Sequence, residues 1–88
     1  MIDLQRYGFD KDDLAFLRMI QEDFDNQNEV DLKYKDYSFC IEPSGMLMSV
    51  VDQSGCLGTY RGFDDLFLHC LIDGRPLIEL VKDLEFGD

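Results

Sequence analysis

His69 and Cys70 are the residues whose types best suit nucleophilic chemistry, because His69 is the only histidine of the chain and Cys70 is one of three cysteines. A cysteine nucleophile needs a histidine that faces its sulfur. Neighbours on a helix project about 100° apart, so this pair cannot easily meet, and no other histidine exists to replace His69. Cys70 also continues an apolar stripe with Leu66 and Phe67. We therefore expect Cys70 to pack in the core and the pair to be non-catalytic.

A metal site is the second kind of chemistry to consider. Structural zinc uses four Cys or His ligands, usually arranged as two close pairs. The chain offers Cys40, Cys56, His69 and Cys70, but only the last two are close in sequence. The acidic stretch DFDNQNEVD, residues 23–31, lacks the glycine and spacing of a calcium loop and predicts at most a weak cation site. The sequence predicts no metal and no cofactor.

Other catalytic patterns are also missing from the sequence. The stretches GCLG and RGFDD match no phosphate-binding glycine motif. The acidic pairs Asp12–Asp13 and Asp64–Asp65 could suggest acid–base catalysis, but both fall at predicted helix starts, where carboxylates cap the backbone. We therefore expect that the protein is not an enzyme.

Charge is the most unusual property of the sequence. Nineteen acidic residues against eight Lys and Arg give the 88-residue chain a net charge of −11. This exceeds the net charge of about 2–8 that is ample for the solubility of a small domain. Such a field repels nucleic acid and anionic membranes and attracts basic surfaces. The sequence therefore favours a basic protein partner over direct binding to nucleic acid or membrane.

Length and cysteine content indicate the number of domains and the cellular compartment of the protein. The chain length fits a single domain spanning residues 1–88. Three cysteines without a Cys-x-x-Cys motif do not make a disulfide framework. The N-terminal residues MIDLQRYGFD lack an apolar run of signal-peptide length, and no stretch approaches the length of a membrane span. We expect a cytoplasmic protein with reduced cysteines, and the sequence leaves its oligomeric state open.

The patterning predicts an α+β fold in three parts. An apolar stripe with Asp10 as N-cap predicts a helix near 10–24. Alternating runs over about 30–61, punctuated by turn residues, predict an antiparallel β-meander of three or four strands. Two short helices are expected near 64–73 and 76–85, because Gly74 reads as a helix end and Pro76 as a helix start. The helices should pack on one face of the sheet.

The apolar positions of these elements predict the core. The expected core residues are Leu14, Leu17, Ile20, Phe39, Ile41, Val50, Leu66, Cys70, Leu77, Leu80 and Val81. The run from Met46 to Val51 is apolar on both of its alternating faces, which is typical of a strand covered on both sides. An exposed patch for a partner is the other interpretation of this run, and the sequence leaves the two open.

The acidic residues are concentrated in and after the first predicted helix. They are Asp10, Asp12, Asp13, Glu22, Asp23, Asp25, Glu29 and Asp31, opposed within residues 1–31 only by Arg6, Lys11 and Arg18. Helical carboxylates three or four positions apart are about 5–6 Å apart, so they can imitate every second phosphate or so of a strand that advances about 3.4 Å per phosphate. A solvated acidic face is the alternative interpretation. The predicted partner-binding residues are Asp12, Asp13, Glu22, Asp23, Asp25 and Glu29.

In size, charge and α+β character, the chain is similar to small acidic proteins encoded by phages and other mobile elements. That group includes anti-CRISPR and anti-restriction proteins, several of which mimic DNA. The segment FDDLFLHCLIDGRPLIELVKDLEF, residues 63–86, looks like the C-terminal end of small proteins from such elements. The resemblance implies an inhibitor that binds the basic surface of a nucleic-acid-processing enzyme, such as a CRISPR effector or a restriction nuclease. The alternatives are a toxin-neutralising immunity protein and a non-enzymatic structural or regulatory module of a phage or mobile element.

Overall fold

The computed structural model describes residues 2–87, and its first two elements are helical. A short 3₁₀ helix, η1, covers Leu4–Tyr7, and the helix α1 covers Lys11–Asp25. α1 begins there because the Asp10 carboxylate accepts the backbone N–H of Asp13, while the Asp13 carboxylate accepts the backbone N–H of Asp10. This reciprocal capping confirms the predicted first helix and its Asp10 cap.

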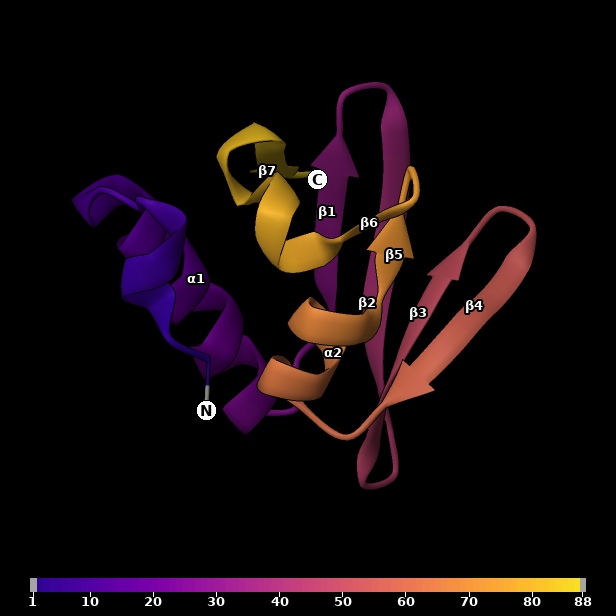
Figure 1. The fold of residues 1–88 in the computed structure, drawn as a ribbon. Coiled ribbons are helices and arrows are strands. Elements are labelled where there is room, and N and C mark those ends of the chain that lie inside the picture. The colour runs from indigo at the N-terminus through magenta and orange to yellow at the C-terminus, as the bar shows by residue number, and fades with distance from the viewer. Residues whose placement is uncertain (1, 88) are drawn as a thin grey trace.

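Four consecutive strands form an antiparallel meander, and a fifth strand from the C-terminal end completes the sheet. The strands are β1 Val30–Tyr34, β2 Tyr37–Ser44, β3 Leu47–Asp52, β4 Gly55–Tyr60 and β7 Leu84–Phe86. Their spatial order is β4-β3-β2-β1-β7, as Figure 1 shows. The α+β class and the meander are confirmed, but the sheet has five strands rather than three or four.

The C-terminal third differs from the two helices predicted over 64–73 and 76–85. It consists of α2 Phe63–His69, the short strands β5 Leu71–Ile72 and β6 Arg75–Pro76, the 3₁₀ helix η2 Leu77–Asp83, and β7. Asp73 and Gly74 have φ angles of 57° and 76° and form the turn between β5 and β6, so Gly74 does not end a helix. The second predicted helix is wrong in type and extent, because its last residues leave η2 and pair with β1 as a strand.

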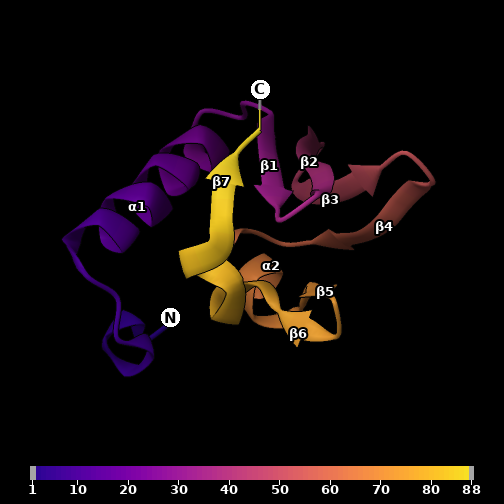
Figure 2. The same ribbon diagram turned by 90° about the horizontal axis from the view of Figure 1, so that it is seen from above.

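The helical segments pack on one face of the sheet, and the strands alternate accordingly. The burial of β1 alternates residue by residue, with Val30, Leu32 and Tyr34 buried. Phe86 is the register partner of Leu32, and its ring lies 4.7 Å from that of Phe16 on α1, which places α1 on this same face. In Figure 2 the sheet curves around α2 and the C-terminal segment, with α1 beside β7. The core therefore lies between the helices and one side of the sheet.

The predicted core is largely confirmed. All of its members are buried except Leu14, which is half-buried. Leu14 lies nearer the start of α1, whereas Leu17 and Ile20 farther along the helix are fully covered.

The strand at Met46–Val51 resolves into a buried side and a more open side. Met48 and Val50 are buried beneath the helices, whereas Ser49 and Val51 are half-buried on the other face. Met46 lies in the turn before β3 and is 95% exposed. The interpretation as a strand covered on both sides is therefore wrong, because the helical segments cover only one face.

No helix within residues 2–87 has the length and apolar character needed to cross a membrane.

Candidate protein-interaction surface

The structure separates His69 from Cys70. Cys70 follows the last turn of α2 and is 1% exposed, so it belongs to the core as predicted. His69 points to solvent, where its Nδ1 lies 2.8 Å from Oδ1 of Asp65 one turn earlier. Asp65 also accepts the backbone N–H of Arg61. The His69 ring is therefore held by a carboxylate at the surface and does not face the Cys70 sulfur.

Five of the six predicted contact residues lie at the ends of α1 or just beyond it, and four of these are exposed. Exposed side chains belong to Asp12, Glu22, Asp25 and Glu29, and Asp23 is half-buried. The Asp23 carboxylate accepts a hydrogen bond from the side-chain amide of Asn28 at 3.4 Å, and its carbonyl accepts the backbone N–H of the same residue. These bonds fix the course of the chain from α1 toward β1.

Asp13, the sixth predicted contact, is held within the protein instead. Its Oδ2 lies 2.6 Å from Nζ of Lys82 in η2, and its side chain is only 16% exposed. The hydrogen bond to Lys82 is the main cause of the lowered pKa of Asp13, and the same bond raises the pKa of Lys82. With its capping bonds to Asp10, Asp13 has a structural role that accounts for its position.

The last turn of α1 has an unfavourable charge pattern. It carries Glu22, Asp23 and Asp25 but no basic residue. The carbonyl end of a helix has a partial negative charge that favours cations, so three acidic residues there raise the electrostatic energy of the folded chain. A cationic partner would relieve this energy.

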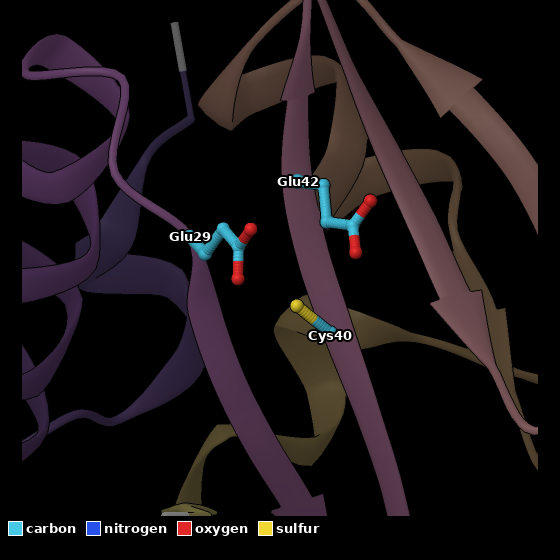
Figure 3. A group of neighbouring side chains, drawn as sticks. All are labelled: Glu29, Cys40 and Glu42. Carbon is cyan, nitrogen blue, oxygen red and sulfur yellow. The ribbon is translucent and has the colours of Figure 1, made fainter.

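The face of the sheet opposite the helices extends this negative region. Cys40 and Glu42 share this face of β2, and Glu29 reaches it from the residue before β1. One oxygen of Glu29, one oxygen of Glu42 and Sγ of Cys40 lie within 4.8 Å of one another. Figure 3 shows the three side chains gathered at the start of β1 and on β2. We call Glu22, Asp23, Asp25, Glu29 and Glu42 the acidic edge. Sequence analysis missed Glu42, although its alternation with Cys40 along β2 was the signal that it shares the face of Cys40.

The ion pairs found among residues 2–87 do not neutralise the acidic edge. They join His69 to Asp65, Arg75 to Glu79 and Lys82 to Asp13. Each of these pairs lies outside the end of α1 and the Glu29–Glu42 contact. The acidic edge therefore keeps its charge in this part of the chain.

The thiol of Cys40, beside the acidic edge, has a raised pKa. Burial, a hydrogen bond to Asp31 and the negative charges of Asp31, Glu42 and Glu29 raise the pKa of its thiol to about 12. A protonated thiol is a poor metal ligand, and three donors fall short of the four that structural zinc requires. Cys56 is on β4, with β3 between it and Cys40, so the two cysteines do not converge. That the protein needs no metal stays a prediction.

A shallow hollow of about 770 Å³ lies on the open face of the sheet, the face opposite the helices, farther along the strands. It is bordered by Asp31 and Lys33 on β1, Ser38 and Cys40 on β2, and Glu85 on β7. Lys33 and Glu85 are register partners, so their opposite charges stand side by side there. Asp52 on β3 also lines the hollow, so acidic side chains outnumber the single lysine there as well.

No protein family matches the chain, and no curated protein and no solved structure is similar to it. The surface must therefore be interpreted from its own chemistry.

Proposed function

We propose that the protein is a small acidic inhibitor that binds the basic surface of a nucleic-acid-processing enzyme, of the anti-CRISPR or anti-restriction kind. The observation that supports this proposal is the acidic edge. Carboxylates crowd the carbonyl end of a helix and the adjoining sheet face, where no ion pair of the described chain reaches them. Their mutual repulsion lowers stability, and binding to a basic surface offsets that loss.

The spacing within the acidic edge suits a surface that normally holds nucleic acid. The facing carboxylate oxygens of Glu29 and Glu42 lie within 4.8 Å of each other. This separation is shorter than two phosphate steps along a strand, each about 3.4 Å along the duplex axis. Lysine and arginine side chains positioned for successive phosphates can therefore contact these carboxylates.

The setting we propose is the cytoplasm, where nucleic-acid-processing enzymes act and cysteines stay reduced. All three cysteines are free in the structure, in agreement with such a setting. The protein itself would use neither a catalytic residue nor a cofactor, because inhibition by occupation requires only binding.

Cleavage assays test the proposal directly. Purified CRISPR effectors and restriction endonucleases cut a labelled DNA target in the presence of increasing amounts of the protein. We expect near-stoichiometric inhibition of one enzyme class and competition with the nucleic-acid substrate. Inhibition should weaken steeply with added salt, because the screening length falls from about 10 Å at 0.1 M to about 3 Å at 1 M.

Two double variants with the same net charge separate the acidic edge from charge in general. Glu22→Lys with Glu29→Lys should abolish inhibition, mainly through a slower association rate. Asp36→Lys with Asp83→Lys changes exposed residues outside the acidic edge and should inhibit nearly as well as the parent. Equal inhibition by both variants would show that the edge is not the contact. Neutralisation of a nuclease toxin, with no effect on the other enzymes, would favour an immunity protein.

A further inference from the structure

A groove of about 550 Å³ lies at the end of the sheet where the β2–β3 turn, the end of α1 and the start of α2 come together. These elements meet in the lower part of Figure 1. The apolar lining of the groove includes Phe24, Phe63, Met46 and Leu47. The rings of Phe24 and Phe63 meet edge to face, with their centroids 6.0 Å apart. The groove is thus built from three elements and has an aromatic wall.

Met46 and Leu47 give the groove an unusually exposed apolar border. Met46 is 95% exposed and Leu47 is 40% exposed. Gly45, with φ at 66°, forms the tight turn that presents them. A methionine at the tip of a hairpin gains little from packing within its own chain, and its flexible thioether adapts to varied partner surfaces. Exposed apolar groups gathered beside a hollow are typical of interaction sites.

The rim of the groove belongs in part to the acidic edge. Asp25, the last residue of α1, lines the groove. The carbonyl end of the helix adds its own negative potential there. Arg61 also lines the groove, and its backbone N–H is bound by Asp65. Asp64 and Asp65 at the start of α2 line the groove as well, so carboxylates outnumber the single guanidinium around it.

We propose that this groove holds a large apolar side chain from a basic segment of the partner protein, while a neighbouring Lys or Arg of that segment pairs with Asp25. This inference rests on the proposed function, because it names the chemistry of the partner segment. Charge complementarity favours a basic segment over a second copy of this chain as the occupant of the groove. A second copy has a net charge of −11 and would place its own acidic rim against the acidic rim of the groove. The apolar groove supplies affinity, and the acidic rim selects for a basic segment.

The test uses a defined probe and the full chain. A capped heptapeptide, Gly-Lys-Arg-Leu-Arg-Lys-Gly, is titrated into the ¹⁵N-labelled protein, and amide shifts are followed by NMR. We expect saturable shifts at Met46, Leu47 and Phe63. A peptide with alanine in place of its leucine should bind about tenfold more weakly, a loss typical of removing a buried leucine side chain. A peptide with glutamate in place of its Lys and Arg should not bind.

Matched protein variants complete the test. Met46→Ser with Leu47→Ser should weaken binding of the leucine peptide about tenfold and remove its preference over the alanine peptide. Leu71→Ser alters an exposed leucine outside the groove and should bind normally. Shifts spread evenly over the acidic surface, or equal binding of the leucine and alanine peptides, would overturn the inference. The cleavage assays do not depend on this result, so the groove can fail while the proposed inhibition stands.

Discussion

Nζ of Lys82 lies 2.6 Å from Oδ2 of Asp13, and this contact joins two segments that are 69 positions apart in the chain. It ties the first turn of α1 to η2 at the far end of the sequence. Asp13 also completes the capping box with Asp10. Asp13, one of the six predicted partner-binding residues, thus stabilises the fold.

Substituting Asp13 and its neighbour should therefore have different effects. Asp13→Asn should lower the thermal midpoint by several degrees, because it removes the negative charge that pairs with Lys82. Asp12→Asn, at an exposed position of the same turn, should leave the midpoint nearly unchanged. Differential scanning calorimetry of both variants measures the contrast. A midpoint equally insensitive to both substitutions would contradict the structural role of Asp13.

The pH dependence of this contact follows from the direction of each shift. The pKa of Asp13 is lowered in the folded state, so its contribution is present above the unfolded pKa and is lost as the pH falls through the folded value. The pKa of Lys82 is raised, so its contribution is complete below the unfolded value and is lost as the pH rises through the folded one. The stability difference between the parent and Asp13→Asn should therefore persist at neutral pH and shrink at both extremes.

The three cysteines should differ sharply in reactivity. Cys56 is exposed, Cys40 is half-buried with a pKa of about 12, and Cys70 is buried. Iodoacetamide reacts with the thiolate, so raising the pKa from 9.0 to about 12 lowers the reactive fraction of Cys40 at pH 8 by about a thousandfold. Mass spectrometry of alkylated peptides should find Cys56 modified first, Cys40 far later, and Cys70 only on unfolding. Early modification of Cys40 would contradict the burial and hydrogen bonding that raise its pKa.

Cys40 should also affect stability at alkaline pH. The unfolded thiol loses its proton near pH 9.0 and the folded one near 12, so deprotonation favours the unfolded state between these values and stability falls as the pH rises. In Cys40→Ala the decline over this range should be shallower, as urea unfolding at several pH values would measure. An equally steep decline would assign the effect to other groups.

β7 supplies a prediction about the sheet, because its adjacent residues point to opposite faces. Leu84 is 6% exposed on the helix-covered face, whereas Glu85 is exposed on the open face. Leu84→Ala should lower the free energy of unfolding by about 2–4 kcal/mol, as burial of a leucine in a core predicts. Glu85→Ala should change it by less than about 0.5 kcal/mol. Urea unfolding of both variants measures the difference, and equal losses would contradict the assigned register.

This strand also shows how far the sequence could predict the fold. The spacing of Leu77, Leu80, Val81 and Leu84 identified four buried side chains but missed Ile78, which is also buried. It did not predict the backbone, since a 3₁₀ helix followed by a strand buries these four side chains as a helix would and covers Ile78 as well. The choice is made by pairing of β7 with β1, about fifty positions away. No local pattern contains that contact.

The candidate surface was predictable to a similar extent. Charge and helical periodicity identified exposed carboxylates at both ends of α1, but the Lys82 contact that engages Asp13 depends on tertiary packing. The approach of Glu42 to Glu29 depends on the register of β1 and β2, in which Val30 pairs with Ile41. The groove likewise needs Phe24, Phe63 and Met46 to meet from three elements.

Removing charge from the acidic edge should stabilise the protein. Glu29 precedes Val30 and Glu42 follows its register partner Ile41, so the two carboxylates lie across from each other at the start of the ladder. Like charges at such cross-strand positions repel, typically by about 0.2–1 kcal/mol.

Glu29→Gln should therefore raise the thermal midpoint, and most of the gain should disappear when Glu42→Gln is already present, because the same repulsion can be relieved only once. Asp36→Asn, at an exposed position outside the edge, removes the same charge and controls for the general effect of lowering the net charge of −11. Thermal unfolding of the single and double variants at low and high salt provides the measurement. Additive gains, or a gain equal to that of Asp36→Asn, would mean that the two carboxylates do not repel each other directly. Non-additive gains would show that Glu29 and Glu42 form a repulsive pair in the folded chain.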